Sequence, residues 1–231
     1  MSLDDLKQRA ALKAVEFVQS GMIVGLGTGS TAVHATRAIG EMLADGRLHH
    51  IVVIPTSQTT RQQAQRSGIP LTTLNEHPQV DITIDGADEI DPRLNLIKGL
   101  GGALLREKIV AVASKRVIII ADDSKRVSQL GSHAPVPVEV IPFAQQTVRH
   151  YLQSLGANVS LRQQNDQPFI TDENNIILDC HFGTIAEPPQ LAQAIRQQPG
   201  VVEHGLFLGL ATDAIIASAT EIIHLQASKP H

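Results

Sequence analysis

The sequence predicts an α/β protein in which a domain built on a parallel β-sheet is followed by a smaller α+β domain. Short apolar runs that are typical of buried strands alternate with segments of helical periodicity up to residue 120, and this alternation is the pattern of a parallel sheet. Three prolines then bracket the segment 136–142, and several strand-like runs follow it. The length of 231 residues fits one large domain or two modest ones.

The first part begins with a segment, Asp4 to Gln19, whose apolar residues recur at helical spacing and which ends at Gly21. Further helices are expected at 31–43, 57–68 and 103–113, and strands at 22–25, 51–54, 80–84 and 117–120. Such short apolar strands suit a parallel sheet that helices cover on both faces. We therefore expect a Rossmann-like domain.

The second part has a different order of elements. After the proline-rich segment we expect helices at 144–155 and 190–198 and strands at 157–162, 169–171, 176–181 and 205–208. This order resembles a ferredoxin-like unit, with its helices on one face of an antiparallel sheet. We expect residues 131–204 to form this inserted α+β domain and its strands to stay outside the parallel sheet. Residues 1–130 and 205–231 would form the Rossmann-like domain.

The composition excludes several classes of protein. Trp is absent, aromatic residues make up 3% of the chain and the net charge is −4, so the stacking residues and positive charge of a nucleic-acid-binding protein are missing. The N-terminus lacks the basic start and apolar middle of a signal peptide, and no apolar run reaches membrane-spanning length. These features predict a cytoplasmic protein without a membrane partner. The one cysteine, Cys180, excludes an internal disulfide, and we expect it to be a buried structural thiol.

A glycine-rich turn, Gly25 to Thr31, joins the first strand to the next helix. Its glycines let the backbone approach a ligand, while N–H groups at the helix start and the Ser30 and Thr31 hydroxyls are donors for an anion. A dinucleotide fingerprint would need glycine at position 30 and an acidic residue where the chain has Pro55-Thr-Ser57. No lysine follows the turn as in a P-loop. We favour a phosphate site without a nucleotide; the alternative is a turn that needs glycine only for its shape.

Four carboxylates fall within the stretch Ile84 to Asp91, directly after an expected strand. Ligands of parallel sheets bind beyond the carboxyl ends of the strands, so Asp85 and Asp88 should face the same edge as the glycine turn. Two carboxylates in one partly dry site can divide the roles of proton donor and acceptor. The rival reading is a Mg²⁺ site, which we rank lower because Lys98 supplies positive charge nearby. Glu89 and Asp91 are expected only to cap or to form turns.

A second glycine-rich loop, Lys98 to Gly102, precedes a helix. The apolar face of that helix is expected to consist of Leu104, Leu105, Ile109 and Val112. Glu107 projects almost opposite, between Arg106 and Lys108, and periodicity alone predicts an ordinary solvated charge. The fourth strand ends in Ala121-Asp-Asp-Ser-Lys125, which places another lysine at the edge where ligands bind.

Taken together, these motifs resemble those of ribose-5-phosphate isomerase, type A. The resemblance rests on the ordered set Thr28 to Thr31, Asp85-Gly-Ala-Asp88, Lys98-Gly with Arg106-Glu-Lys108, and Ala121 to Lys125, and it also covers Pro137 to Pro142 and Gly205-Leu-Phe207. Each motif is weak alone, but the ordered set is specific and extends over nearly the whole chain.

The resemblance implies a function that needs no cofactor and no metal. The chain would interconvert D-ribose 5-phosphate and D-ribulose 5-phosphate through an enediolate, in the non-oxidative branch of the pentose phosphate pathway, and the Rossmann-like domain would be catalytic. Glu107 would move the proton between C1 and C2, Asp85 would assist ring opening, Lys98 would stabilise the oxyanion, and Asp88 would orient substrate and lysine. The substrate-binding residues would be Lys7, Thr28, Gly29, Ser30, Thr31, Gly86, Ala87, Gly99, Leu100, Gly101 and Lys125. A homodimer is expected by resemblance only.

The chain departs from the family pattern at one position, and two other classes of protein share features of its fold. The family loop commonly reads Lys-Gly-Gly-Gly, whereas here Leu100 occupies the middle position, although the spacing from Lys98 to Glu107 is kept. Effector domains of sugar-phosphate-sensing regulators share the fold and bind without turnover, but they follow an N-terminal helix-turn-helix, for which the residues before Met22 leave no room. Coenzyme A transferases are more distant relatives and are usually longer.

Overall fold

The computed structural model of the chain describes residues 1–227 and divides them into two compact units. The first unit comprises Met1–Ala87, Arg106–Lys125 and residues 209–227; the second comprises Asp88–Leu105 and Arg126–Leu208. The segment Asp88–Leu105 therefore groups with the second unit, ahead of the boundary at residue 131 that the sequence pattern predicts. The domain boundaries at 131 and 204 stay a prediction.

The first unit is built on a six-stranded sheet in the order β15-β14-β6-β3-β1-β2. Its strands are β1 (Ile23–Leu26), β2 (Val52–Pro55), β3 (Ile82–Gly86), β6 (Val117–Asp122), β14 (Asp213–Ala217) and β15 (Ile222–Gln226). All neighbouring pairs are parallel except β14 with β15. The predicted α/β class with a mostly parallel sheet is therefore confirmed, and β14 shows how the C-terminal stretch rejoins that sheet.

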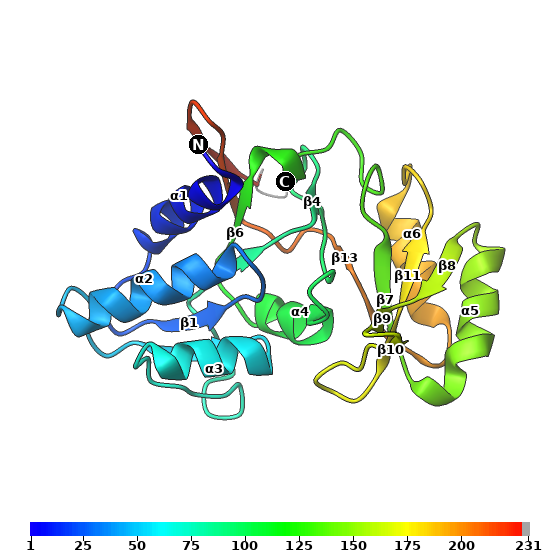
Figure 1. Cartoon of the computed structure of the whole chain (residues 1–231), viewed down its shortest axis with the longest axis horizontal. Helices are drawn as coiled ribbons and strands as arrows, with labels where there is room; N and C mark the ends of the chain where they lie inside the picture. Colours follow the sequence, from blue (N-terminus) through cyan, green and yellow to red (C-terminus); the bar gives the residue numbers. More distant parts are fainter. Residues whose placement is uncertain (228–231) are drawn as a thin grey trace. The chain divides into compact units, whose positions relative to one another are not determined.

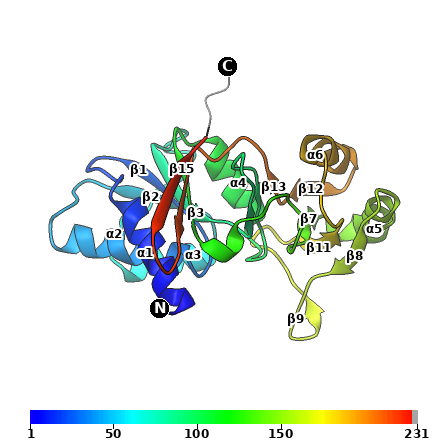
Figure 2. The ribbon, with the colours of Figure 1, turned by 90° about the horizontal axis from the view of Figure 1, so that it is seen from above.

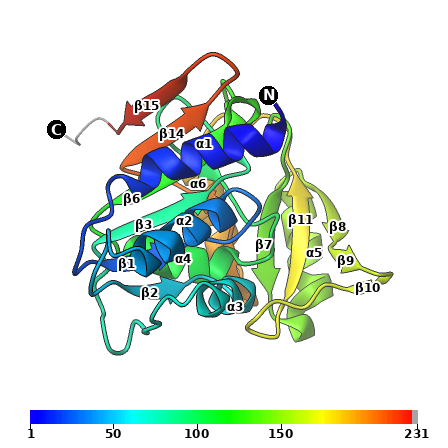
Figure 3. The same cartoon turned by 60° about the vertical axis from the view of Figure 1, so that its left-hand side comes forward.

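Helices cover both faces of this sheet because its strands alternate buried side chains between the faces. The helices are α1 (Leu3–Val15), α2 (Ala32–Ala44), α3 (Gln58–Arg66) and α4 (Leu104–Val112). Val24 and Val53 pack in the cluster that contains α1 and α2, which lie in front of the sheet in Figure 3. Ile54 and Val80 pack with Val110 of α4 on the opposite face.

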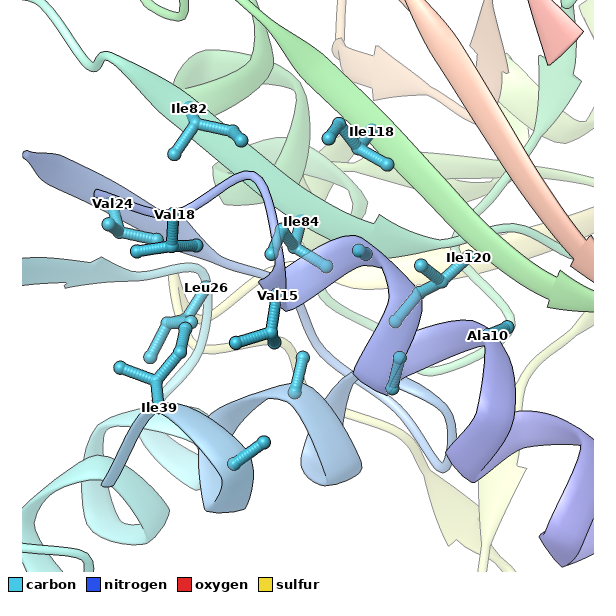
Figure 4. Close-up of a cluster of buried hydrophobic side chains, with 14 of the residues drawn as sticks. Ala10, Val15, Val18, Val24, Leu26, Ile39, Ile82, Ile84, Ile118 and Ile120 are labelled. Carbon is cyan, nitrogen blue, oxygen red and sulfur yellow. The ribbon is translucent and has the colours of Figure 1, made fainter. Parts of the chain in front are cut away.

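The main core of the first unit lies between α1, α2 and the central strands. Figure 4 shows this cluster of aliphatic side chains, including Val15 and Ile39 from the helices and Leu26, Ile84 and Ile120 from the strands. Leu26 is the last residue of β1, and Ile84 directly precedes Asp85 and Gly86, the last residues of β3. The core therefore fixes the ends of these strands.

The second unit contains a four-stranded antiparallel sheet in the order β12-β7-β11-β8. Its elements are β7 (Val136–Val140), α5 (Gln145–Ser154), β8 (Asn158–Leu161), β11 (Ile176–His181), α6 (Pro188–Gln197) and β12 (Val201–His204). Val148 of α5 and Ile195 of α6 share one buried cluster with Val138 and Leu178, so both helices cover the same face of the sheet (Figure 2). This is the β-α-β-β-α-β order of a ferredoxin-like unit. As expected, β8 and β11 do not join the parallel sheet.

Several small elements were missed by the sequence pattern. A three-stranded sheet joins β4 (Glu89–Ile90), β5 (Leu96–Ile97) and β13 (Leu206–Phe207). Of these strands only β13 was expected, at 205–208, and β12 of the antiparallel sheet was also missed. The strand expected at 169–171 is wrong: the hairpin of β9 (Gln163–Gln164) and β10 (Gln167–Pro168) precedes it, and only a single bridge forms at Ile170. Short 3-10 turns, η1 (Asp123–Lys125) and η2 (Pro142–Ala144), complete the chain traced in Figure 1.

The one cysteine of the chain lies in the second unit. Cys180 is buried in β11, and burial raises the pKa of its thiol, which is the expected behaviour of a structural cysteine.

Asp213 accepts hydrogen bonds from Arg116, Thr212 and His224. Burial raises the pKa of Asp213, but these donors outweigh burial and hold the pKa well below its usual range. Within residues 1–227, no helix is both long and apolar enough to cross a lipid bilayer.

Candidate active site

The glycine turn after β1 depends on two close approaches that only glycine permits. A Cβ on Gly25 would lie 2.0 Å from Thr83 Oγ1 and 2.7 Å from Val110 Cγ1, so Gly25 lets α4 pack close against the sheet. A Cβ on Gly27 would lie 2.0 Å from Asp85 Oδ1 and 2.6 Å from Asp85 Cα. Gly27 therefore makes room for the Asp85 side chain beside the turn.

The end of the same turn brings together groups that can donate hydrogen bonds to an anion. Lys7 Nζ donates to Ser30 Oγ at 2.9 Å, which brings a lysine from α1 to the turn. Thr31 is the N-cap residue of α2, and among the described residues its side chain makes no capping hydrogen bond. Val33 N and His34 N donate to Gly29 O and Thr31 O, and the dipole of the helix favours negative charge at this end. Lysine, hydroxyls and N–H groups here suit a phosphate.

Asp85 lies at the end of β3 and its side chain is 2% exposed. Its Oδ1 accepts a hydrogen bond from its neighbour Gly86 N at 2.7 Å and one from Thr28 N at 3.3 Å. The prediction that this carboxylate shares an edge with the glycine turn is thus confirmed by direct contact. A buried carboxylate that accepts backbone N–H groups is held in one orientation.

Glu107 corrects the interpretation made from periodicity. Glu107 is 4% exposed, whereas Ile109 and Val112 are 48% and 67% exposed; of the expected apolar face, Leu104 is fully buried and these two residues are not. The helix turns its other side inward because Val110 packs on Ile54 and Val80, where Gly25 allows a close approach. Glu107 lies three residues before Val110 and therefore on the same inward face of the helix, and the neighbouring Lys108 is also buried. Glu107 is therefore a buried carboxylate and not a solvated charge.

Lys98 and Asp88 belong to the second unit and meet through the loop that follows β5. Lys98 is 3% exposed, its N–H donates to Gly205 O at 2.9 Å, and its ammonium lies 5.5 Å from the centre of the Phe207 ring. Asp88 Oδ2 accepts a hydrogen bond from Leu100 N at 2.9 Å. Asp88 thus fixes the loop that begins with Lys98.

The same loop is held from a second side by an ion pair that the sequence did not reveal. Arg162 Nη1 donates to Gly99 O at 2.7 Å and to Leu100 O at 3.1 Å. Its other nitrogens bind both carboxylate oxygens of Asp179. The unusual Leu100 is 45% exposed and does not take a positive φ, unlike Gly99 and Gly102. The loop therefore tolerates Leu100 because its left-handed positions are still glycines.

The two remaining acids of the stretch are structural, as expected, but in different ways. Asp91 closes a turn by accepting from Arg93 N and Asn95 N, each at 2.8 Å. Glu89 is 1% exposed and accepts from the backbone N–H groups of Gly131, His133 and Ala134 at 2.6 to 2.8 Å. Glu89 thus anchors a distant loop instead of capping its own segment.

The predicted site residues thus fall into two groups. The first unit holds Lys7, Thr28, Gly29, Ser30, Thr31, Asp85, Gly86, Ala87, Glu107 and Lys125, and the second holds Asp88, Lys98, Gly99, Leu100 and Gly101. Contacts connect Lys7 with Ser30 and Thr28 with Asp85 in the first group. In the part of the chain that is described, no three His, Cys, Asp or Glu side chains are grouped to hold a metal ion. The first group contains the buried carboxylates of Asp85 and Glu107, and the second contains the buried Lys98.

The comparison with known proteins agrees with this chemistry. Residues 52–221 match the family model described as ribose 5-phosphate isomerase A (phosphoriboisomerase A). Ribose-5-phosphate isomerase A of Gloeobacter violaceus is 57% identical and that of Roseiflexus castenholzii 53% identical, each over at least 94% of both chains.

Solved structures agree over the whole fold. A D-ribose-5-phosphate isomerase in complex with phospho-erythronic acid has a TM-score of 0.96 at 37% identity and covers 98% of this chain and 100% of its own. The Plasmodium falciparum ribose 5-phosphate isomerase has a TM-score of 0.95 at 42% identity, with the same coverage. The chain belongs to the ribose 5-phosphate isomerase A family.

Proposed function

We propose that the chain interconverts D-ribose 5-phosphate and D-ribulose 5-phosphate, with Glu107 as the base that carries the proton between C1 and C2. The family supports the reaction, and the burial of Glu107 supports the role of that residue. A carbon acid next to a carbonyl loses its proton slowly, so the base must be held in place beside groups that stabilise the enediolate. The alternative of a regulatory domain that binds without turnover gains no support from these relatives.

The buried lysine and aspartates supply the other roles. Lys98, which is 3% exposed, stabilises the negative charge that develops on the substrate oxygen. Asp85 exchanges protons with the sugar oxygens and assists ring opening, and Asp88 orients the Lys98 loop through Leu100 N.

The phosphate of the substrate binds at the turn from Gly29 to Thr31, with Lys7 and Lys125 as its cations. Support comes from the hydrogen bond between Lys7 and Ser30 and from the start of α2 directly after this turn. The relative bound to phospho-erythronic acid holds a phosphorylated sugar acid, which has the same anionic group. That compound is therefore a suitable inhibitor for testing the site.

We also propose that the protein acts as a cytoplasmic homodimer. The proposal follows from the family resemblance. Light scattering after size-exclusion chromatography measures the mass directly, and a monomer mass at assay concentration would contradict the dimer.

The function is tested by assaying purified protein with D-ribose 5-phosphate and comparing Glu107→Gln with a matched control, Glu41→Gln. Glu41 is an exposed glutamate of α2, so its variant should behave as wild type. Glu107→Gln should still be protected against thermal unfolding by phospho-erythronic acid, while kcat falls by about 100-fold or more. A wild-type protein without isomerase activity would contradict the function; an active Glu107→Gln variant would contradict only the assignment of the base.

A further inference from the structure

A cluster of buried hydroxyls surrounds Thr28 and is not part of the predicted site. It consists of Thr56, Ser57 and Thr60 at the turn from β2 into α3, which are 0%, 6% and 1% exposed. The Thr28 hydroxyl lies 2.8 Å from that of Thr56, 2.9 Å from that of Ser57 and 3.1 Å from that of Thr60. Such a cluster of buried hydroxyls fixes the side chain at its centre only if their protons can be shared out consistently.

One arrangement of protons satisfies every hydroxyl. The Thr56 hydroxyl donates to Leu26 O at 3.0 Å, which leaves its oxygen lone pairs facing the Thr28 hydroxyl. Thr28 then donates to Ser57, and Ser57 donates to Thr60. Thr60 donates to Gly27 O at 3.0 Å. In this arrangement the Thr28 hydroxyl donates its single proton to Ser57 Oγ and has no proton left to donate to a ligand.

The end of this hydrogen-bond chain lies on the peptide group that contacts Asp85. Thr60 binds the C=O of the peptide between Gly27 and Thr28, and the N–H of the same peptide donates to Asp85 Oδ1. A peptide group is planar and its C=O and N–H point in opposite directions, so fixing one fixes the other. Gly27 allows the carboxylate to lie against this peptide, because any Cβ would overlap it.

We propose that Thr28, Thr56, Ser57 and Thr60 are positioning residues, which orient the Asp85 carboxylate through the Gly27–Thr28 peptide, and that the Thr28 hydroxyl does not bind the substrate phosphate. The inference rests on the proposed isomerase function, because it assigns these residues to the same reaction. Phosphate then binds to Ser30, Thr31 and the backbone of the turn. The cluster acts on the step that Asp85 serves and not on phosphate affinity.

The test compares Thr60→Val and Thr28→Val, which replace a hydroxyl with a methyl group of similar size, with two other variants. Thr60→Ser keeps the hydroxyl and should restore activity. Thr36→Val removes another buried hydroxyl, one that binds only Ala32 O within α2, and is the control for lost stability. Each is assayed for kcat and KM with D-ribose 5-phosphate, for inhibition by inorganic phosphate, and for melting temperature.

We expect kcat to fall about tenfold in both cluster variants, which is the effect of one lost buried hydrogen bond. The inhibition constant of inorganic phosphate should stay within about twofold of wild type, and Thr36→Val should lower only the melting temperature. If Thr28→Val weakens phosphate inhibition and leaves kcat unchanged, the hydroxyl binds phosphate and the proposal is wrong. Unchanged kcat in Thr60→Val would also overturn it. Absence of activity in the wild type would instead contradict the proposed function.

Discussion

Replacing Arg162 with Met tests how strongly the Lys98 loop depends on a distant ion pair. Arg162 and Asp179 are 11% and 16% exposed at their side chains, so breaking the pair leaves a poorly hydrated carboxylate. Removing one partner of a buried pair costs about 3 to 5 kcal/mol, compared with about 1 kcal/mol or less at a surface. The loss of two hydrogen bonds to Gly99 O and Leu100 O acts in the same direction. We therefore expect Arg162→Met to lower the free energy of unfolding by about 3 kcal/mol or more.

Activity should fall as well, because the released loop begins at Lys98. Arg162→Lys should be intermediate, since one ammonium group cannot bind the carboxylate and both carbonyls together. The matched control is Arg149→Met, which loses one hydrogen bond to Val159 O in the same unit and should cost about 1 kcal/mol. Urea unfolding and steady-state kinetics measure both effects. A loss in Arg162→Met no larger than that of the control, with unchanged kcat, would refute the reasoning.

Three further predictions concern the phosphate, the metal and acid stability. Lys125→Ala should raise KM severalfold and leave kcat nearly unchanged if the contact is equally strong in the ground and transition states; steady-state kinetics with unchanged KM would exclude Lys125 from the site. Activity should survive exhaustive treatment with EDTA, because lysines complement the acids, and reproducible recovery by Mg²⁺ or Mn²⁺ would show otherwise. The low pKa of Asp213 stabilises the fold above the pKa of the unfolded carboxyl, about 3.9, and this contribution is lost as the pH falls through the folded pKa. The stability difference between wild type and Asp213→Asn in urea unfolding should therefore shrink from about pH 7 to about pH 3, and a constant difference would contradict the assignment.

The sequence predicted the parts of the fold that local patterns encode. Apolar runs located the central strands, and the proline-rich segment marked the change to an antiparallel sheet. The strands β4 and β5 were missed because each has only two residues and is defined by its partners. Pairing between distant segments leaves no local pattern in such short strands.

The candidate site was predicted by its motifs and misread by periodicity. Asp85 and the glycine turn meet as the strand ends of a parallel sheet require. Glu107 was placed in solvent because periodicity assumes that the apolar side of a helix is the buried side, and α4 buries Glu107 and exposes Val112. Arg162 had no signal at all, because its contact with Gly99 joins residues far apart in the sequence and depends on the fold.

If Glu107 is the base, a helix that buries this carboxylate while exposing Ile109 and Val112 is arranged for chemistry at the expense of stability. Ile109 and Val112 could be hidden and Glu107 solvated if burial alone decided the packing of α4. The close approach at Gly25 and the packing of Val110 hold the helix in its present orientation.

Proton exchange at the transferred carbon tests the central role of Glu107 most directly. Wild-type protein and Glu107→Gln are incubated with D-ribose 5-phosphate in D₂O, and deuterium at C1 and C2 of the products is followed by NMR and mass spectrometry. A carboxylate base that exchanges with solvent between the two transfers should introduce deuterium in the wild type. Glu107→Gln should lose exchange and turnover together, by about 100-fold or more, while it still binds phospho-erythronic acid. Exchange and turnover near wild-type rates in Glu107→Gln would contradict the account and would move the base to Asp85 or Asp88.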